Sequence, residues 1–122
     1  MTSSSSSSLK VLQINLNRSS LATESALQVA IELGVGLVVV QEPWVLAPDQ
    51  DYTKARSILH PSFIQLLPLG PYRPRTLVYM ARELSSTVTL SPTTPQDPDL
   101  LVVDIIVGKS KIQLVNIYNE AD

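Results

Sequence analysis

The sequence predicts an α/β fold with about seven strands and one long helix. A strand pattern, a helix pattern and a second strand pattern follow one another near the start of the 122 residues. Further on, short apolar segments alternate with turn-forming residues, and the last two have the pattern of a hairpin. This order is typical of a βαβ unit joined to antiparallel strands.

The composition excludes several classes of protein and site. The chain has a formal net charge of −2, no cysteine and one histidine, His60. It therefore cannot hold a disulfide, a cysteine-ligated zinc or iron–sulfur centre, or a site with two imidazoles. Residues 35–40 form the longest apolar run, far short of the roughly 20 residues of a membrane span, and no apolar signal region precedes them. We expect an intracellular protein with no membrane partner.

The chain divides into a leader and one domain. Residues 1–8 end in a run of serines, which buries no apolar surface, so we expect a disordered leader. Residues 9–122 are expected to form the domain, and the homopolymer carries no functional signal.

The first elements of the domain predict the βαβ unit. Residues 9–17 alternate between apolar and polar side chains, as in a half-buried strand. Apolar residues then recur at helical spacing between a serine N-cap, at Ser19 or Ser20, and the stop signal Gly34. Residues 36–42 are apolar on both faces, which is typical of a parallel strand covered on both sides.

The remaining sequence predicts short strands and one short helix, the latter at residues 54–59. The expected strands are 62–67, 76–82, 87–90, 100–107 and 111–118. Gly108 suits the positive φ of the turn between the last two. One helix cannot cover both faces of such a sheet, and the chain stops directly after a strong strand pattern. We therefore expect that the second half of the domain is missing.

Polar residues fall at the carboxyl ends of the predicted strands, where open α/β sheets bind ligands. Asn15 and Asn17 close the first strand on one face, Glu42 closes the second and Tyr118 closes the last. If the last strand joins the same sheet in the same direction, these residues meet at one edge. One carboxylate with amide and phenol oxygens suits Mg²⁺ and does not suit zinc or copper. Each residue also has a structural explanation, as a solvated strand end, a loop cap or a core tyrosine.

Three segments together resemble the endonuclease/exonuclease/phosphatase superfamily: LQINLNR at 12–18, VQEPW at 40–44 and NIYN at 116–119. The second and third are most similar to the endonuclease domain of non-LTR (LINE-type) retrotransposons. The resemblance covers only the N-terminal half of such a domain. It implies a partial four-layered α/β sandwich, in which two mixed sheets pack face to face with helices outside.

The resemblance also implies a function, that of a Mg²⁺- or Mn²⁺-dependent hydrolase that nicks the phosphodiester backbone of nuclear DNA beside a reverse transcriptase. By match to the family's motifs, Glu42 would be a metal ligand and Asn15 a catalytic residue that holds the metal or the phosphate. Tyr118 would be a catalytic residue that hydrogen-bonds the phosphate. Asn17 would contact the phosphate or support the residues that do.

Two motifs of the family are absent from this sequence: Gly-Asp-x-Asn, which orients the nucleophile, and Ser-Asp-His, which supplies the general base. We therefore expect weak or absent metal binding and negligible catalysis by this chain alone. Two alternatives stay open. One is a non-enzymatic relic or interaction fragment that self-associates through an exposed apolar face. The other is a phosphatase or phospholipid phosphodiesterase of the same superfamily.

The only basic cluster in the sequence is formed by Arg73, Arg75 and Arg82. Arg73 and Arg75 are candidates for contacts with the DNA backbone. The alternative is a solvated strand edge whose charges oppose aggregation.

Overall fold

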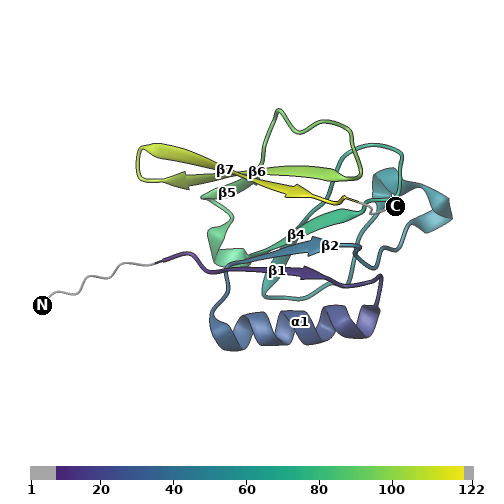
Figure 1. The fold of residues 1–122 in the computed structure, drawn as a ribbon, viewed down its shortest axis with the longest axis horizontal. Coiled ribbons are helices and arrows are strands. Elements are labelled where there is room, and N and C mark those ends of the chain that lie inside the picture. Colours follow the sequence, from purple (N-terminus) through teal and green to yellow (C-terminus); the bar gives the residue numbers. More distant parts are fainter. Residues whose placement is uncertain (1–7, 120–122) are drawn as a thin grey trace, which may run out of the picture.

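In a computed structural model, the described part of the chain forms one α-helix and two sheets stacked in three layers (Figure 1). The structure describes residues 8–119. The predicted leader, residues 1–8, lies outside this range except for Ser8, which is exposed. The α/β class, the seven strands and the single α-helix are confirmed.

The βαβ unit forms as predicted from β1 (Val11–Asn15), α1 (Ser20–Leu33) and β2 (Leu37–Gln41). The two strands are parallel neighbours in the first sheet. Ser19 is the N-cap of α1, and its side chain accepts the Ala22 N–H at 3.0 Å. The helix ends at Gly34, whose φ of +69° is the left-handed conformation that favours glycine.

The first sheet has the strand order β1-β2-β4-β3. It is completed by β3 (Phe63–Leu66) and β4 (Thr76–Ala81), and β4 runs antiparallel to both of its neighbours. The short helix predicted at residues 54–59 is wrong. Arg56 instead exchanges two backbone hydrogen bonds with Leu46, at 2.8 and 3.0 Å, which holds this stretch extended.

Short 3₁₀ turns occur before and after these strands. Two of them, η1 (Pro48–Gln50) and η2 (Tyr52–Lys54), precede the extended stretch around Arg56. A third, η3 (Arg82–Leu84), follows β4 and leads toward the second sheet.

The second sheet consists of three antiparallel strands in the order β5-β6-β7. They are β5 (Val88–Leu90), β6 (Leu100–Val107) and β7 (Ser110–Ile117). Gly108, with φ +60°, forms the predicted turn between β6 and β7. The last strand, β7, does not join the first sheet, as the predicted meeting of the strand-end residues required. It pairs instead with β6 along eight residue pairs.

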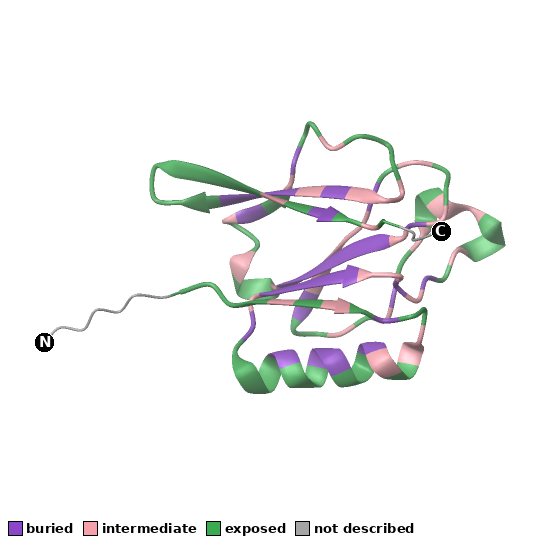
Figure 2. Ribbon diagram, viewed as in Figure 1, coloured by how far each residue is buried: buried purple, intermediate pink, exposed green. Residues whose placement is uncertain are grey.

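Two apolar cores separate the layers. Between α1 and the first sheet, Leu27 and Ala30 pack against Val38, Val40 and Tyr79. A second core between the sheets contains residues of β2 and β4 together with Leu101, Val103 and Ile105 of β6. The buried segments concentrate on β2 and β4, the central strands of the first sheet (Figure 2). The chain's own second sheet thus covers the inner face of the first.

The outer face of the second sheet carries exposed apolar side chains. The alternation along β6 turns Val102 away from the inter-sheet core, and its cross-strand partner is Val115. Val115 is 50% exposed and Ile117, on the same face, is 59% exposed. In the described part of the chain no helix covers this face. The sequence led us to expect an apolar face left open by a missing sheet, but the second sheet covers that inner face of the first.

Within residues 8–119, none of the helices has the length and apolar character required to cross a membrane.

Candidate functional site

The predicted residues Asn15, Glu42 and Tyr118 lie at one edge of the molecule. Asn15 ends β1 and is paired with Gln41, the last residue of β2. Glu42 follows directly, and its Oε1 accepts a hydrogen bond of 2.9 Å from the Tyr118 hydroxyl. Tyr118 comes from the end of β7, so the edge is assembled from both sheets rather than from one.

Three residues at this edge have left-handed backbone conformations that are uncommon for residues other than glycine. Their φ values are +48° at Asn17, +58° at Arg18 and +52° at Glu42. The Arg18 N–H donates to the Glu42 carbonyl at 2.8 Å, and the Glu42 N–H donates to the Arg75 carbonyl at 3.0 Å. Such conformations cost on the order of 1–3 kcal/mol each and cluster at functional sites. The backbone around Glu42 is therefore held by its neighbours in a conformation it would not adopt alone.

Asn15 shapes the turn that follows β1. Its Oδ1 accepts the Asn17 N–H at 2.9 Å, which is the loop-capping role allowed by the sequence. Both asparagines are exposed. An amide oxygen has two acceptor positions and the amide nitrogen has two N–H donors, so Asn15 can serve the turn and also bind a ligand.

A buried amide pair, which was not predicted from the sequence, joins the two sheets behind this edge. Asn116 is 1% exposed, and its Nδ2 donates to the carbonyls of Val40 and Leu77, both at 3.0 Å. Its Oδ1 accepts from Gln41 Nε2 at 2.6 Å. The signal was present in β7, where Asn116 has the same parity as the core-packed Leu114. A polar residue at an inward position requires buried partners.

The three arginines that are close together in the sequence do not all lie at one place in the structure. Arg75 lies beside the candidate site, where its guanidinium carbon is 5.1 Å from the centre of the Tyr118 ring. Arg82 follows the other end of β4 and donates to the carbonyls of Pro61 and Phe63. The strand that separates these arginines carries them to opposite ends of the sheet. Arg73 is half-buried in the loop before β4.

The chemistry of this edge fits a hydrated hard cation. Glu42 offers a carboxylate and Asn15 an amide oxygen, the ligand types that Mg²⁺ takes while it keeps several waters. Among residues 8–119, no three His, Cys, Asp or Glu side chains converge. His60 lies before β3, where its Nδ1 accepts the Ser62 N–H at 3.0 Å. Glu42 and Asn15 therefore offer the oxygen donors that Mg²⁺ or Mn²⁺ would take.

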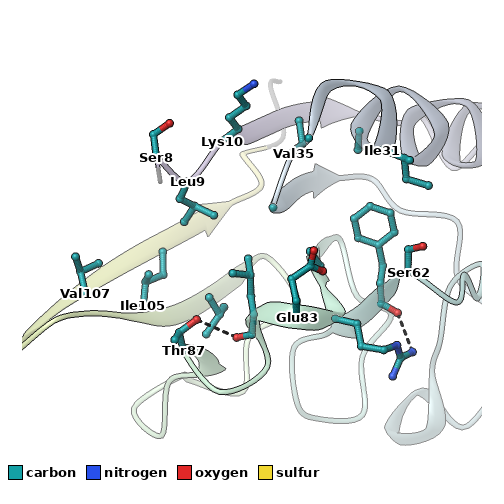
Figure 3. A pocket seen from close by; sticks show the side chains of 18 of the residues that line it. Ser8, Leu9, Lys10, Ile31, Val35, Ser62, Glu83, Thr87, Ile105 and Val107 are labelled. Atoms are coloured by element: carbon teal, nitrogen blue, oxygen red, sulfur yellow. Dashed lines mark hydrogen bonds between the residues drawn. The ribbon is translucent and has the colours of Figure 1, made fainter. Parts of the chain in front are cut away.

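An apolar pocket lies away from these residues. It has a volume of about 590 Å³ and opens near the start of β1 and the end of α1 (Figure 3). Its lining is mostly apolar and includes Leu9, Val35 and Ile105. The predicted site residues lie at the opposite ends of β1 and β2, so this pocket is separate from them.

No family model and no curated protein matches the chain. Among solved structures, the chain is similar to the endonuclease domain of TRAS1, a telomere-specific non-LTR retrotransposon, with a TM-score of 0.68 and 23% identity. The similarity covers 93% of this chain and 45% of the other, so the chain spans less than half of that domain's length. At this identity the likeness shows the fold. The predicted resemblance is thus confirmed at that level: the chain has the fold of part of a retrotransposon endonuclease domain.

Proposed function

We propose that this chain carries the metal- and phosphate-binding part of a nuclease site that nicks DNA. The main supporting observation is the hydrogen bond from Tyr118 to Glu42, which joins two of the predicted site residues across two sheets. The fold shared with a retrotransposon endonuclease domain supports the same assignment.

The residues at the edge have distinct proposed roles. Glu42 binds the divalent cation, and Tyr118 orients its carboxylate through Oε1. Asn15 holds either the cation, through the second acceptor position of the amide oxygen that caps the turn at Asn17, or a phosphate oxygen, through its amide N–H groups. The cation, when bound, polarises a phosphoryl oxygen and stabilises the leaving alkoxide.

The described residues do not supply a general base at this edge. The single histidine lies at the other end of the first sheet, against Phe63. General acid–base assistance is worth about 10²- to 10⁴-fold in rate. We therefore propose that these residues bind a cation and phosphate but hydrolyse DNA far more slowly than a site that includes a base.

Cation binding can be tested by titrating the protein with Mn²⁺ and following the paramagnetic broadening of its amide NMR signals. We expect broadening centred on Asn15, Gln41 and Glu42, and its loss in Glu42→Gln. Glu83→Gln is the matched control, because Glu83 lies in η3 at the far end of β4. Uniform broadening, or the same pattern in Glu42→Gln, would contradict the proposal. Nicking of supercoiled plasmid, measured in parallel, reports residual hydrolysis.

A second candidate function rests on the exposed apolar outer face of the second sheet, around Val115 and Ile117. On this alternative the chain is a non-enzymatic interaction fragment that associates with a second copy. Light scattering after size exclusion separates the two: a dimer that dissociates in Val115→Lys, without site-specific Mn²⁺ broadening, favours the interaction fragment. If the nuclease assignment holds, the DNA substrate implies a nuclear location.

The phosphatase and phospholipid phosphodiesterase alternatives are tested by assaying the same protein for hydrolysis of those phosphoesters.

A further inference from the structure

We propose that Arg75, held by Asp99, is the positioning residue that keeps Tyr118 against Glu42. The inference deepens the proposed function, since it names the residues that set the geometry of that site. It also gives Arg75 a role other than the DNA-backbone contact expected from the sequence.

Arg75 and Asp99 form a two-point ion pair. Arg75 Nε donates to Asp99 Oδ1 at 2.5 Å and Nη2 donates to Oδ2 at 2.7 Å. Both side chains are about one-third exposed, at 31% and 30%. Two parallel bonds fix the plane of the guanidinium, which a single contact would leave free to rotate.

The fixed guanidinium lies over the Tyr118 ring, 5.1 Å from its centre. A cation at this distance is attracted to an aromatic face. The Asp99 carbonyl also accepts the Tyr118 N–H at 2.8 Å. The Asp99 carbonyl therefore holds the backbone of Tyr118, and the guanidinium that Asp99 fixes faces its ring, at the point where β7 ends.

The same arginine holds Glu42. Its carbonyl accepts the Glu42 N–H at 3.0 Å, at the residue with φ +52°. Its own N–H donates to the Pro98 carbonyl at 2.8 Å, which ties the start of β4 to the segment before β6. Arg75 thus touches both partners of the Tyr118–Glu42 hydrogen bond, one through its side chain and the other through its backbone.

The side-chain contribution can be tested with Arg75→Lys and Asp99→Asn. Lysine keeps the charge but lacks the planar fork, and asparagine removes the carboxylate. Both variants should shift the ring signal of Tyr118 in protein with ¹³C-labelled tyrosine, where the four tyrosine signals are assigned with Tyr118→Phe. Both should weaken Mn²⁺ binding by no more than the about 10- to 100-fold expected when the direct partner of a metal-binding residue, here Tyr118 for Glu42, is removed. Arg82→Lys, at the other end of β4, should change neither.

A charge swap, Arg75→Asp with Asp99→Arg, distinguishes positioning from a simple ion pair. The swap restores the attraction between the two segments but places a carboxylate where the cation faced the ring. We expect the thermal unfolding midpoint of the double variant to be higher than that of either single variant and close to that of the unsubstituted protein. The Tyr118 ring signal and the Mn²⁺ affinity should stay altered. Recovery of all three, or an unshifted Tyr118 signal in Arg75→Lys, would overturn the proposal.

The ring signal makes this test independent of the proposed function. If the unsubstituted protein binds no Mn²⁺, the metal site is wrong, yet the Tyr118 signal still reports whether Arg75 holds the ring. If Mn²⁺ binds at Glu42 but Arg75→Lys leaves its affinity and the ring signal unchanged, the positioning role alone fails.

Discussion

The hydroxyl of Tyr118 donates a hydrogen bond of 2.9 Å to Glu42, which lies 76 positions earlier in the chain. The bond links the end of β7, in the second sheet, to the end of β2, in the first. The packing of the two sheets and the geometry of the candidate site are therefore coupled. A change that moves one sheet relative to the other also changes the distance between these two residues.

Tyr118→Phe removes the hydroxyl and leaves the ring under Arg75. We expect a loss of about 1 kcal/mol in the free energy of unfolding, the usual net value of one hydrogen bond, and weaker Mn²⁺ binding. Urea denaturation and Mn²⁺ titration measure the two effects. Tyr72→Phe is the control, since Tyr72 is 66% exposed. Unchanged Mn²⁺ affinity in Tyr118→Phe would show that the hydroxyl does not orient Glu42.

Asn116→Leu tests the buried amide between the sheets. The variant removes the side-chain hydrogen bonds that the carbonyls of Val40 and Leu77 accept in addition to their β-ladder bonds, and it leaves the Gln41 amide without this partner. A lost hydrogen bond costs about 0.5–1.5 kcal/mol and an unsatisfied buried group about 1–3 kcal/mol, so we expect a strongly destabilising substitution. Asn119→Leu, at an exposed position, should have little effect on the urea midpoint. A similarly small effect of Asn116→Leu would mean that water replaces the lost bonds.

Glu42→Gly and Glu42→Ala separate the backbone cost of the site from its chemistry. Both remove the carboxylate and should abolish Mn²⁺ binding at this edge. Because φ is +52° at this residue, glycine should leave the protein about 1 kcal/mol more stable than alanine does. The comparison is read from urea denaturation of the two variants. An alanine variant as stable as the glycine variant would show that the left-handed backbone carries no strain.

We expect ionisation of Tyr79 to lower the free energy of unfolding at alkaline pH. Burial raises the pKa of its phenol above the ordinary value of 10.0, and the hydroxyl donates to the Ile58 carbonyl at 2.8 Å. The unfolded chain then releases this proton at a lower pH than the folded protein does. Its contribution is therefore constant below the ordinary value and is lost as pH rises above it.

Urea midpoints measured from neutral pH to about pH 11 check this prediction against Tyr79→Phe. The variant should be less stable at neutral pH, because it lacks the bond to Ile58, but its midpoint should fall less steeply above about pH 10. Parallel curves for the two proteins would assign the alkaline loss to other groups.

The local elements could be predicted because their signals are local. The apolar spacing, the cap at Ser19 and the left-handed stop at Gly34 define α1 through contacts within a few residues. Gly108 likewise fixes the β6–β7 turn. The helix predicted at 54–59 was wrong because this stretch pairs with residues outside it. Arg56 forms a β-bridge with Leu46, ten positions earlier, and local sequence signals do not reveal that pairing.

The candidate site could be predicted only in its membership. Its residue types at strand ends indicated Asn15, Glu42 and Tyr118, and the structure places them at one edge. We expected them to meet if the last strand joined the first sheet, but β7 reaches this edge as part of the second sheet. Asn116 was missed because its importance lies in carbonyls contributed by other strands.

The sequence alone predicted the βαβ unit, the closing hairpin, the absence of cysteine chemistry in this chain and the residue types proposed for the cation site. These follow from hydrophobic periodicity, turn residues and composition, which act within a short stretch of chain or need no structure at all. The three-dimensional fold alone brings Arg75 into contact with Tyr118 and Asp99 and places Arg82 at the far end of the sheet. It does so because pairing and packing bring together residues that the chain separates, and they separate residues that the chain places close together.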